Sequence, residues 1–136
     1  MKALIVGSGR QLGRAPQAAA PAAAAVTALG RGELDLSDEG AVSSTIAAIA
    51  PDIVFNAAAY IAVDKAESGR AQAFAINDAS VGFLVRATHV VGGRLVHVST
   101  DFDFDGTSRI PYKISSAPAP LGVYGHSKLA GEQSAG

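Results

Sequence analysis

Short apolar runs recur along the chain, separated by longer segments of mixed polarity. The runs cover residues 3–6, 26–29, 53–55 and 94–98. Runs this short, bounded by glycine, proline or polar residues, are typical of strands that are buried on both faces in a parallel sheet.

The segment after the second run predicts a helix. Ser37 or Asp38 is a suitable N-cap, because a short polar side chain can accept a hydrogen bond from the free amides of a first helical turn. Apolar residues then recur at helical spacing at Val42, Ile46 and Ile49.

A longer helix is predicted over residues 71–89, and Gly92-Gly93 closes it. The sequence alone favours an exposed position for Asn77, a polar residue within this helix. A last helix is predicted over residues 124–133, after a loop at 107–123 that contains three prolines.

The alanine-rich segment 15–25 carries two opposed signals. Alanine favours helix, whereas a proline inside a helix costs about 3 kcal/mol. Because Pro16 and Pro21 interrupt this segment, we expect a short, broken or displaced helix here.

The alternation of strands and helices predicts an α/β fold. The expected architecture is a Rossmann-like, doubly wound parallel sheet with helices on both faces and right-handed crossovers. A chain of 136 residues is long enough for one domain with a real hydrophobic core.

Composition narrows the classes of function. Hydrophobic residues make up 49% and charged residues 17%, which is typical of a globular protein. A net charge of −1 without a basic tract argues against a nucleic-acid partner. The chain has no cysteine, and we predict no metal site. No apolar run reaches the roughly 20 residues of a membrane span, and the N-terminus does not resemble a signal peptide, so we expect a cytoplasmic protein without a membrane partner.

A tyrosine and a lysine, Tyr124 and Lys128, lie four residues apart at the start of the last predicted helix. This spacing places both side chains on one helical face. A lysine ammonium beside a phenol lowers the phenol's pKa from about 10, and such a tyrosine can give a proton to a carbonyl oxygen as a hydride arrives. The same spacing is also common on exposed surface helices.

A glycine-rich turn, Gly7-Ser8-Gly9-Arg10-Gln11-Leu12-Gly13, follows the first strand. Such a turn lets backbone amides approach a pyrophosphate at a helix N-terminus. The spacing is irregular, because Gly7 and Gly9 fit the start of G-x-G-x-x-G, whereas Gly7 and Gly13 fit the two ends of G-x-x-G-x-x-G. An ordinary glycine turn is the alternative.

Small and hydroxyl residues follow the third and fourth predicted strands, at the edge where open α/β sheets bind ligands. Asn56-Ala57-Ala58-Ala59-Tyr60 follows the third strand, and Ser99-Thr100-Asp101 follows the fourth. Small residues allow a ligand to lie close to the backbone. Helix packing and turn capping are the alternatives for these two stretches.

Four stretches together resemble the dTDP-4-dehydrorhamnose reductase family of extended short-chain dehydrogenases/reductases. They are residues 7–13, 56–67 (N-A-A-A-Y-I-A-V-D-K-A-E), 99–106 (S-T-D-F-D-F-D-G) and 120–132 (P-L-G-V-Y-G-H-S-K-L-A-G-E). The likeness keeps the family's order and runs from Met1 to about Glu132.

The resemblance implies a reduction step of nucleotide-sugar and cell-surface polysaccharide biosynthesis. NADPH, or NADH, delivers hydride to the C4 ketone of dTDP-4-dehydro-L-rhamnose and gives dTDP-L-rhamnose. Tyr124 would donate the proton, Lys128 would lower the pKa of Tyr124 and hold the nicotinamide ribose, and Thr100 would hydrogen-bond the substrate carbonyl. A dTDP-sugar is the implied small-molecule partner, and a homodimer is left open.

The family pattern assigns further residues to the ligands. Those assigned to the cofactor are Gly7, Gly9, Arg10, Gln11, Leu12, Gly13, Asp35, Leu36, Ala57, Ala58, Ala59, Tyr60, Asn77, Ser99, Tyr124 and Lys128. Those assigned to the substrate are Thr100, Asp101, Phe102 and Tyr124.

The chain departs from the family pattern at several points. Arg10 stands where the family usually has glycine, and its side chain would either crowd the pyrophosphate or bind the 2′-phosphate of NADPH. Phe102-Asp103 replaces the usual Tyr-Val. Family members are about twice as long, and their later half forms most of the sugar-nucleotide pocket. We therefore assign residues 1–136 to an NAD(P)-binding Rossmann domain that lacks the substrate domain, and we expect it not to turn over substrate alone.

Two other functions compete with this assignment. The first is a non-catalytic NADP-binding regulatory subunit, like that of methionine adenosyltransferase; the presence of Thr100, Tyr124 and Lys128 weighs against it. The second is a different sugar-nucleotide epimerase or dehydratase of the extended class, against which the stretch at residues 56–67 weighs.

Overall fold

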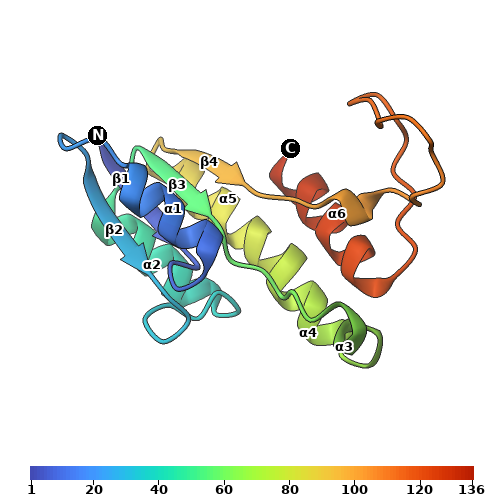
Figure 1. The fold of residues 1–136 in the computed structure, drawn as a ribbon. Helices are drawn as coiled ribbons and strands as arrows, with labels where there is room; N and C mark the ends of the chain where they lie inside the picture. Colours follow the sequence, from blue (N-terminus) through green and yellow to red (C-terminus); the bar gives the residue numbers. More distant parts are fainter.

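The computed structural model describes residues 1–136 and contains a four-stranded parallel sheet (Figure 1). The strands are β1 (Lys2–Val6), β2 (Ala25–Leu29), β3 (Ile53–Asn56) and β4 (Arg94–His97), and their order in the sheet is β2-β1-β3-β4. Val6 pairs with Leu29 and with Asn56, and Asn56 pairs with His97. The carboxyl ends of all four strands therefore meet at one edge of the sheet.

Helices cover both faces of the sheet, as the sequence predicted. Helix α1 (Gln11–Ala19) lies in front of the strands in Figure 1, whereas α2 (Glu39–Ile49) and α5 (Ser80–Val90) lie behind them and pack against each other. The buried core lies between the sheet and this second layer, and it consists of Leu4, Val6, Leu34, Leu36, Val42, Ile46, Val54, Leu84 and Ala87. Burying each large aliphatic side chain contributes about 1.5–3 kcal/mol, which makes this layer the main source of stability.

Helix α2 begins as the polar and apolar pattern indicated. Of the two candidate caps, Asp38 is the N-cap, and its carboxylate accepts a hydrogen bond from the amide of Ala41 at 3.0 Å. Val42 and Ile46 are fully buried, and Ile49 packs against the same core.

Helix α1 differs from the expectation for the alanine-rich segment. It begins at Gln11, ends at Ala19 before Pro21, and contains Pro16 without interruption. Of the three outcomes expected for this segment, short, broken or displaced, the helix is short, and Pro16 does not break it. Because proline has no amide hydrogen, Pro16 cannot donate a helical hydrogen bond to the Leu12 carbonyl.

The long helix predicted over residues 71–89 contains an irregular turn. Residues 70–90 are helical throughout, as α4 (Arg70–Phe74), a π-helical turn η1 (Ala75–Ala79) and α5. Asn77 lies in the π turn and is 1% exposed, so the prediction of an exposed asparagine is wrong. Such turns insert one residue into a helix and are frequent at functional sites.

The last helix lies beyond the carboxyl edge of the sheet (Figure 1). Helix α6 (Val123–Ala135) packs against η1, α4, α5 and the short α3 (Val63–Ser68). A 3₁₀ turn, η2 (Asp101–Asp103), and a segment without helix or strand at 104–122 connect β4 to α6, in agreement with the predicted loop.

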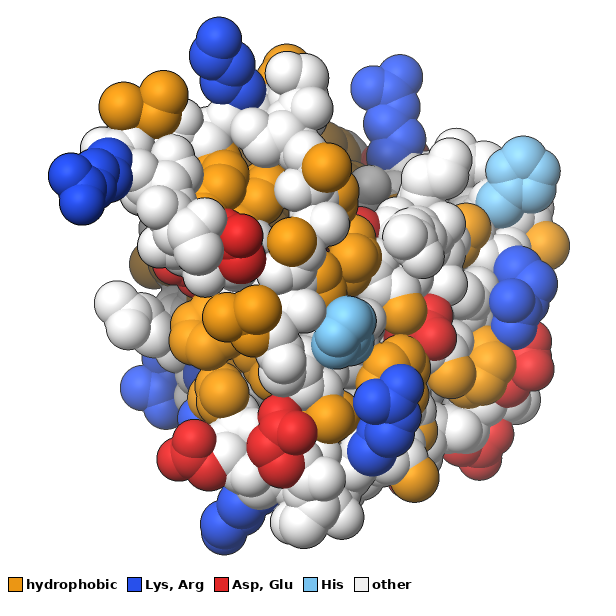
Figure 2. Space-filling model, turned by 90° about the vertical axis from the view of Figure 1, so that its right-hand side faces the viewer, with side chains coloured by type: hydrophobic (Ala, Val, Ile, Leu, Met, Phe, Trp, Pro, Cys, Tyr) orange, Lys and Arg blue, Asp and Glu red, His pale blue; other side chains and the backbone are white.

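The side of the molecule that carries α6 has no patch of a single charge. Figure 2 shows Lys and Arg side chains dispersed among Asp and Glu on this face. None of the helices combines the length and the apolar character that crossing a membrane requires.

Candidate functional site

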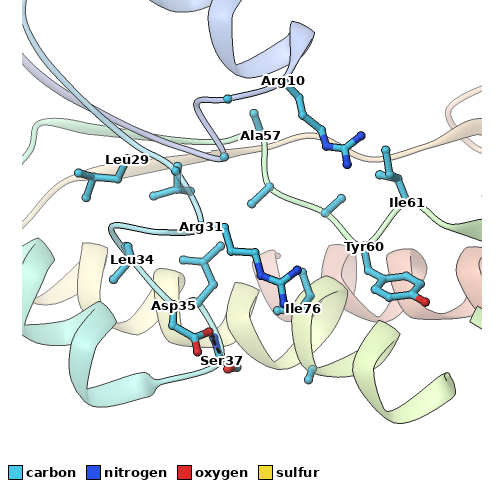
Figure 3. A pocket seen from close by; sticks show the side chains of 18 of the residues that line it. Arg10, Leu29, Arg31, Leu34, Asp35, Ser37, Ala57, Tyr60, Ile61 and Ile76 are labelled. Carbon is cyan, nitrogen blue, oxygen red and sulfur yellow. Dashed lines mark hydrogen bonds between the residues drawn. The ribbon is translucent and has the colours of Figure 1, made fainter.

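A cleft of about 610 Å³ lies at the carboxyl edge of the sheet (Figure 3). Its walls are the glycine loop after β1, the segment after β2, the segment after β3 and the π turn. Nine of the residues predicted to bind the cofactor line it: Gly7, Gly9, Arg10, Asp35, Leu36, Ala57, Ala58, Ala59 and Tyr60.

Two glycines of the loop allow the backbone to pack closely. Gly7 has a φ of +79°, and a Cβ atom there would lie 2.5 Å from the amide nitrogen of Ala58. A Cβ atom on Gly13 would lie 2.2 Å from the carbonyl oxygen of Gly7, whereas one on Gly9 would meet no atom within 4 Å. Gly7 and Gly13 therefore hold the loop against the neighbouring strand and the start of α1.

The start of α1 is suited to an anionic ligand. Its N-cap, Arg10, has extended backbone and no capping side chain, so the first-turn amides are free to donate. A helix N-terminus with free amides favours a phosphate group. In Figure 3 the Arg10 side chain extends along the cleft toward Ile61.

A second arginine on this cleft was missed by the sequence analysis. Arg31 lies two residues after the end of β2 and extends into the cleft toward Ile76 (Figure 3). The signal for it was present, because Rossmann folds place a ribose-binding or phosphate-binding residue near the end of the second strand. The other lining residues that were missed are Val6, Leu29, Gly30, Leu34, Ser37, Ile61, Gln72, Ala75 and Ile76.

Hydrogen bonds from Ser37 stabilise the charged carboxylate of Asp35. Its Oδ1 atom accepts hydrogen bonds from the Ser37 hydroxyl at 2.7 Å and from the Ser37 amide at 2.9 Å. The side-chain and the backbone hydrogen bond from Ser37 both lower the pKa of Asp35. The carboxylate therefore shapes the turn after β2.

Asn77 connects the cleft to the last helix. Its Oδ1 atom accepts from the Tyr60 amide at 2.8 Å, and its Nδ2 donates to the Tyr60 carbonyl at 3.1 Å and to the Ser127 hydroxyl at 2.9 Å. The Ser127 hydroxyl donates in turn to the Tyr124 carbonyl at 2.7 Å. A Cβ on Gly131 would lie 2.0 Å from the Asn77 carbonyl oxygen, so α6 packs directly on the π turn. A direct contact of Asn77 with the cofactor stays a prediction.

Tyr124 lies in a second hollow, of about 330 Å³. Its ring meets the ring of Phe102 edge-on, with centroids 5.4 Å apart and planes at 85°. Asp101 lines the same hollow. The Thr100 hydroxyl accepts from the Phe102 amide at 3.2 Å, which fixes the start of η2. Three of the four predicted substrate residues thus share one hollow, next to Thr100 in the chain.

The remaining residues predicted to bind the cofactor lie outside the 610 Å³ cleft. Gln11, Leu12 and Gly13 form the first turn of α1, next to the loop that lines the cleft. Ser99 follows β4, and its hydroxyl donates to Asp103 at 3.2 Å. The cofactor contacts of these four residues stay predictions.

Lys128 is 2% exposed and makes its polar contacts away from Tyr124. Its Nζ atom donates to the Val98 carbonyl at 2.6 Å and lies 3.2 Å from Nε2 of His97. The lysine reaches inward to the end of β4, where a backbone carbonyl accepts its hydrogen bond. Its roles in lowering the pKa of Tyr124 and in holding the nicotinamide ribose stay predictions. Burial lowers the pKa of Lys128, while the charges of Asp103 and Glu132 oppose that shift.

Asp103 is a buried carboxyl that the sequence analysis noted only as a departure from the family pattern. It is 3% exposed; Oδ2 accepts from the Ser99 hydroxyl at 3.2 Å, and Oδ1 has no hydrogen-bond partner. Burial, followed by the neighbouring carboxyl of Glu132, raises the pKa of Asp103 to about 6. Because the pKa of Asp103 is raised and that of Lys128 is lowered, the contacts that α6 makes with η2 and β4 depend on pH.

Known proteins match nearly the whole chain. A family profile described as "RmlD substrate binding domain" matches residues 1–135. The dTDP-4-dehydrorhamnose reductase of Burkholderia thailandensis is 42% identical over 132 residues, which are 97% of this chain and 44% of that protein. The reductase of Sinorhizobium fredii is 41% identical over 132 residues, with 97% and 45% covered. The chain thus spans less than half the length of these curated relatives.

Solved structures agree with this match. The dTDP-4-dehydrorhamnose reductase of Clostridium acetobutylicum superposes with a TM-score of 0.97 at 34% identity, over 99% of this chain and 49% of that one. The reductase of Bacillus anthracis, described in complex with NADP, gives a TM-score of 0.95 at 33% identity, over 98% and 48%. A UDP-glucose 4-epimerase from Brucella ovis, at 21% identity and a TM-score of 0.87, shares the fold.

The glycine loop, the cleft and the Tyr124 helix therefore occur in one chain in the order that the motifs predicted, and the matched residues include all of them. The chain belongs to the RmlD substrate binding domain family and corresponds to the N-terminal portion of the dTDP-4-dehydrorhamnose reductases.

Proposed function

We propose that the chain is the cofactor-binding portion of an NADPH-dependent reductase that converts dTDP-4-dehydro-L-rhamnose to dTDP-L-rhamnose. The observation that carries this proposal is the cleft at the carboxyl edge of the sheet. It brings together the glycine loop, the segment after β2 and Ala57–Tyr60, while α6 presents Tyr124 in a second hollow. The relatives that match almost the whole chain are dTDP-4-dehydrorhamnose reductases.

The cleft fits a dinucleotide with a phosphate on its ribose. Gly7 and Gly13 pack the loop tightly, and Gly9 on the cleft meets nothing within 4 Å of an added Cβ, so the loop backbone can approach a pyrophosphate there. The amides at the start of α1 are uncapped, and Arg10 and Arg31 place two guanidinium groups on the same cleft. Two cations favour NADPH over NADH, because a guanidinium binds phosphate through charge-assisted hydrogen bonds.

The chemistry divides between the cofactor and two hydroxyl groups of the chain. Bound NADPH supplies the hydride that reduces the C4 carbonyl. Tyr124 donates the proton to the carbonyl oxygen, and the Phe102 ring holds the Tyr124 ring by its edge-on contact. The Thr100 hydroxyl donates a hydrogen bond to the same oxygen, where negative charge develops.

The experiment has two stages. The first is a calorimetric titration of the 136-residue chain with NADPH and, in parallel, NADH; we expect saturable binding with NADPH preferred. The second joins the chain at Gly136 to the later part of the Burkholderia thailandensis relative and supplies dTDP-4-dehydro-L-rhamnose with NADPH. We expect one NADPH to be consumed for each dTDP-L-rhamnose formed.

The outcomes separate the alternatives. An absence of NADPH binding in both proteins would contradict a cofactor role for the cleft. Binding without turnover in the joined protein would favour a non-catalytic NADP-binding subunit. A product formed without net NADPH consumption would indicate an epimerase, because an epimerase returns the hydride to its substrate.

A further inference from the structure

Partly buried hydrogen bonds run from Ala58, at the cleft, through Asn56 and His97 to Lys128. The Ala58 amide determines which atom of each pair donates and which accepts. The Ala58 amide donates to Oδ1 of Asn56 at 3.1 Å. Because a backbone N–H can only donate, the amide oxygen of Asn56 has to face Ala58. The Nδ2 group of Asn56 therefore faces the ring of His97, with Nδ2 and Nδ1 3.0 Å apart. Asn56 is buried, so water does not provide another partner.

The orientation of Asn56 determines which ring nitrogen of His97 carries the proton. A neutral imidazole has one N–H donor and one acceptor. Since Nδ2 of Asn56 can only donate, Nδ1 of His97 accepts and the proton is on Nε2. Burial is the largest of the influences that lower the pKa of His97 to about 4, so the ring is neutral at neutral pH.

The Nε2–H of His97 points at the amine of Lys128, 3.2 Å away. An ammonium group carries only donors and cannot accept this hydrogen bond, whereas a neutral amine has a lone pair. The amine also donates to the Val98 carbonyl at 2.6 Å. An uncharged amine satisfies both contacts, while an ammonium would set one N–H against another.

The charged groups around Lys128 come from three elements. His97 lies on β4, Asp103 on η2 and Glu132 on α6 itself. The two carboxyls favour a charged lysine, but the chain's ion pair joins Arg86 to Glu39, and Lys128 has no carboxylate oxygen within 4.0 Å. Burial is the largest influence on the pKa of Lys128 and lowers it.

We propose that His97 is a positioning residue that directs its Nε2–H at Lys128 and so weakens the lysine's hold on its proton, in a direction of hydrogen bonding set by the Ala58 amide and passed on by Asn56. The proposal rests on the proposed function, because a reductase that uses Tyr124 as its proton donor is expected to use Lys128 beside it. It adds that the lysine cation assigned to the phenol gives up its proton at a lower pH than an exposed lysine does. Because Ala58 lines the cleft, these hydrogen bonds connect the cofactor side to the lysine.

The first test is NMR of the 136-residue chain without added cofactor, with ¹⁵N-labelled histidine and lysine. His89 and His126 are exposed references for the ring nitrogens, and Lys2, Lys65 and Lys113 are exposed references for the amines. We expect the Nε2–H tautomer at His97 and loss of the Lys128 proton at least one pH unit, roughly, below the three exposed lysines. An Nδ1–H tautomer, or a Lys128 that titrates with the other lysines, would overturn the proposal.

The second test reverses the direction with a substitution of nearly equal shape, Asn56→Asp. A carboxylate accepts from both Ala58 and His97, so the ring proton moves to Nδ1 and Nε2 becomes an acceptor for a lysine ammonium. We expect the His97 tautomer to reverse and the Lys128 titration to rise by about one pH unit or more. An unchanged tautomer in a folded variant would overturn the proposal, and if the variant does not fold, the wild-type tautomer and titration decide it.

A control separates hydrogen-bond direction from simple charge. Asp103→Asn removes a carboxyl that faces Lys128, so we expect it to lower the Lys128 titration and to leave the Nε2–H tautomer of His97 unchanged. A reversed tautomer in this control would contradict the route through Asn56. None of these readings uses cofactor or substrate, so a failure here is distinguishable from a failure of the proposed reductase function.

Discussion

The carboxylate of Glu67 accepts a hydrogen bond from the backbone amide of Val123, with the two atoms 2.8 Å apart. Val123 is the first residue of α6, and its N-cap, Gly122, has no side chain that could cap the helix. A Cβ on Gly122 would lie 2.9 Å from Oε1 of Glu67, so the cap and the glycine fit each other. The last residue of the N-A-A-A-Y-I-A-V-D-K-A-E stretch thus fixes the helix start, one residue before Tyr124.

Removing this cap should loosen α6. We expect Glu67→Ala to lower the free energy of unfolding by about 0.5–2 kcal/mol, the usual range for a lost N-terminal cap. Glu67→Gln keeps an acceptor oxygen and should lose less than half as much. Denaturation by urea measures both, and an alanine variant as stable as the wild type would contradict a capping role.

The glycines of the loop should differ sharply in how well they tolerate substitution by alanine. Gly13→Ala places a Cβ against the Gly7 carbonyl, so we expect a loss of about 2 kcal/mol or more of unfolding free energy, with loss of NADPH binding. Gly9→Ala is the matched control, because a Cβ there meets nothing within 4 Å; its stability should change by no more than about 0.5 kcal/mol. Thermal unfolding compares the two variants, and equal losses of stability at the two positions would refute the packing argument.

The two arginines on the cleft should select the phosphorylated cofactor. We expect Arg31→Ala and Arg10→Ala each to weaken NADPH binding about 10-fold or more, since a charge-assisted hydrogen bond contributes about 1.5–3 kcal/mol. NADH affinity should change by less than about 3-fold. Arg14→Ala, on the exposed side of α1 and off the cleft, is the control. Equal losses for NADPH and NADH, measured by calorimetry, would show that the arginines do not read the 2′-phosphate.

The hydroxyl of Tyr124 should matter for chemistry and little for binding. In the protein joined to the later part of a relative, we expect Tyr124→Phe to lower kcat at least about 100-fold, as for the loss of a general acid. The phenylalanine keeps the edge-on contact with Phe102, so NADPH affinity should stay close to the wild type. A variant with near wild-type kcat would remove Tyr124 from the mechanism.

The Asp103 carboxyl should make the chain less stable as pH rises. Its pKa is about 6 in the folded chain and 3.8 as the ordinary value, so between these pH values the folded state binds more protons than the unfolded state. Stability therefore falls from about pH 4 to pH 6 and stays lower above that range.

We expect Asp103→Asn to remove this slope and to be more stable than the wild type at pH 7 by about 1–2 kcal/mol. Its amide can donate to Glu132, where a carboxylate cannot. Urea denaturation at several pH values measures the effect, and a variant that keeps the wild-type slope would exclude Asp103 as its source.

The local pattern of the sequence determined the strands, the glycine loop and the start of α2. The apolar runs at residues 3–6, 26–29 and 53–55 are strands, and Asp38 caps α2, because burial on a sheet face and capping within one turn depend on neighbours along the chain. The motif order likewise predicted the family and nine residues of the cleft.

Only the tertiary structure decided how the site is held together. Asn77 is buried because the π turn aims its amide at Tyr60 and Ser127, which lie 17 and 50 residues away along the chain. Lys128 contacts His97 and Val98 because α6 packs over the end of β4. Such partners depend on where helices and strands meet in space, and helical spacing within one segment carries no information about them.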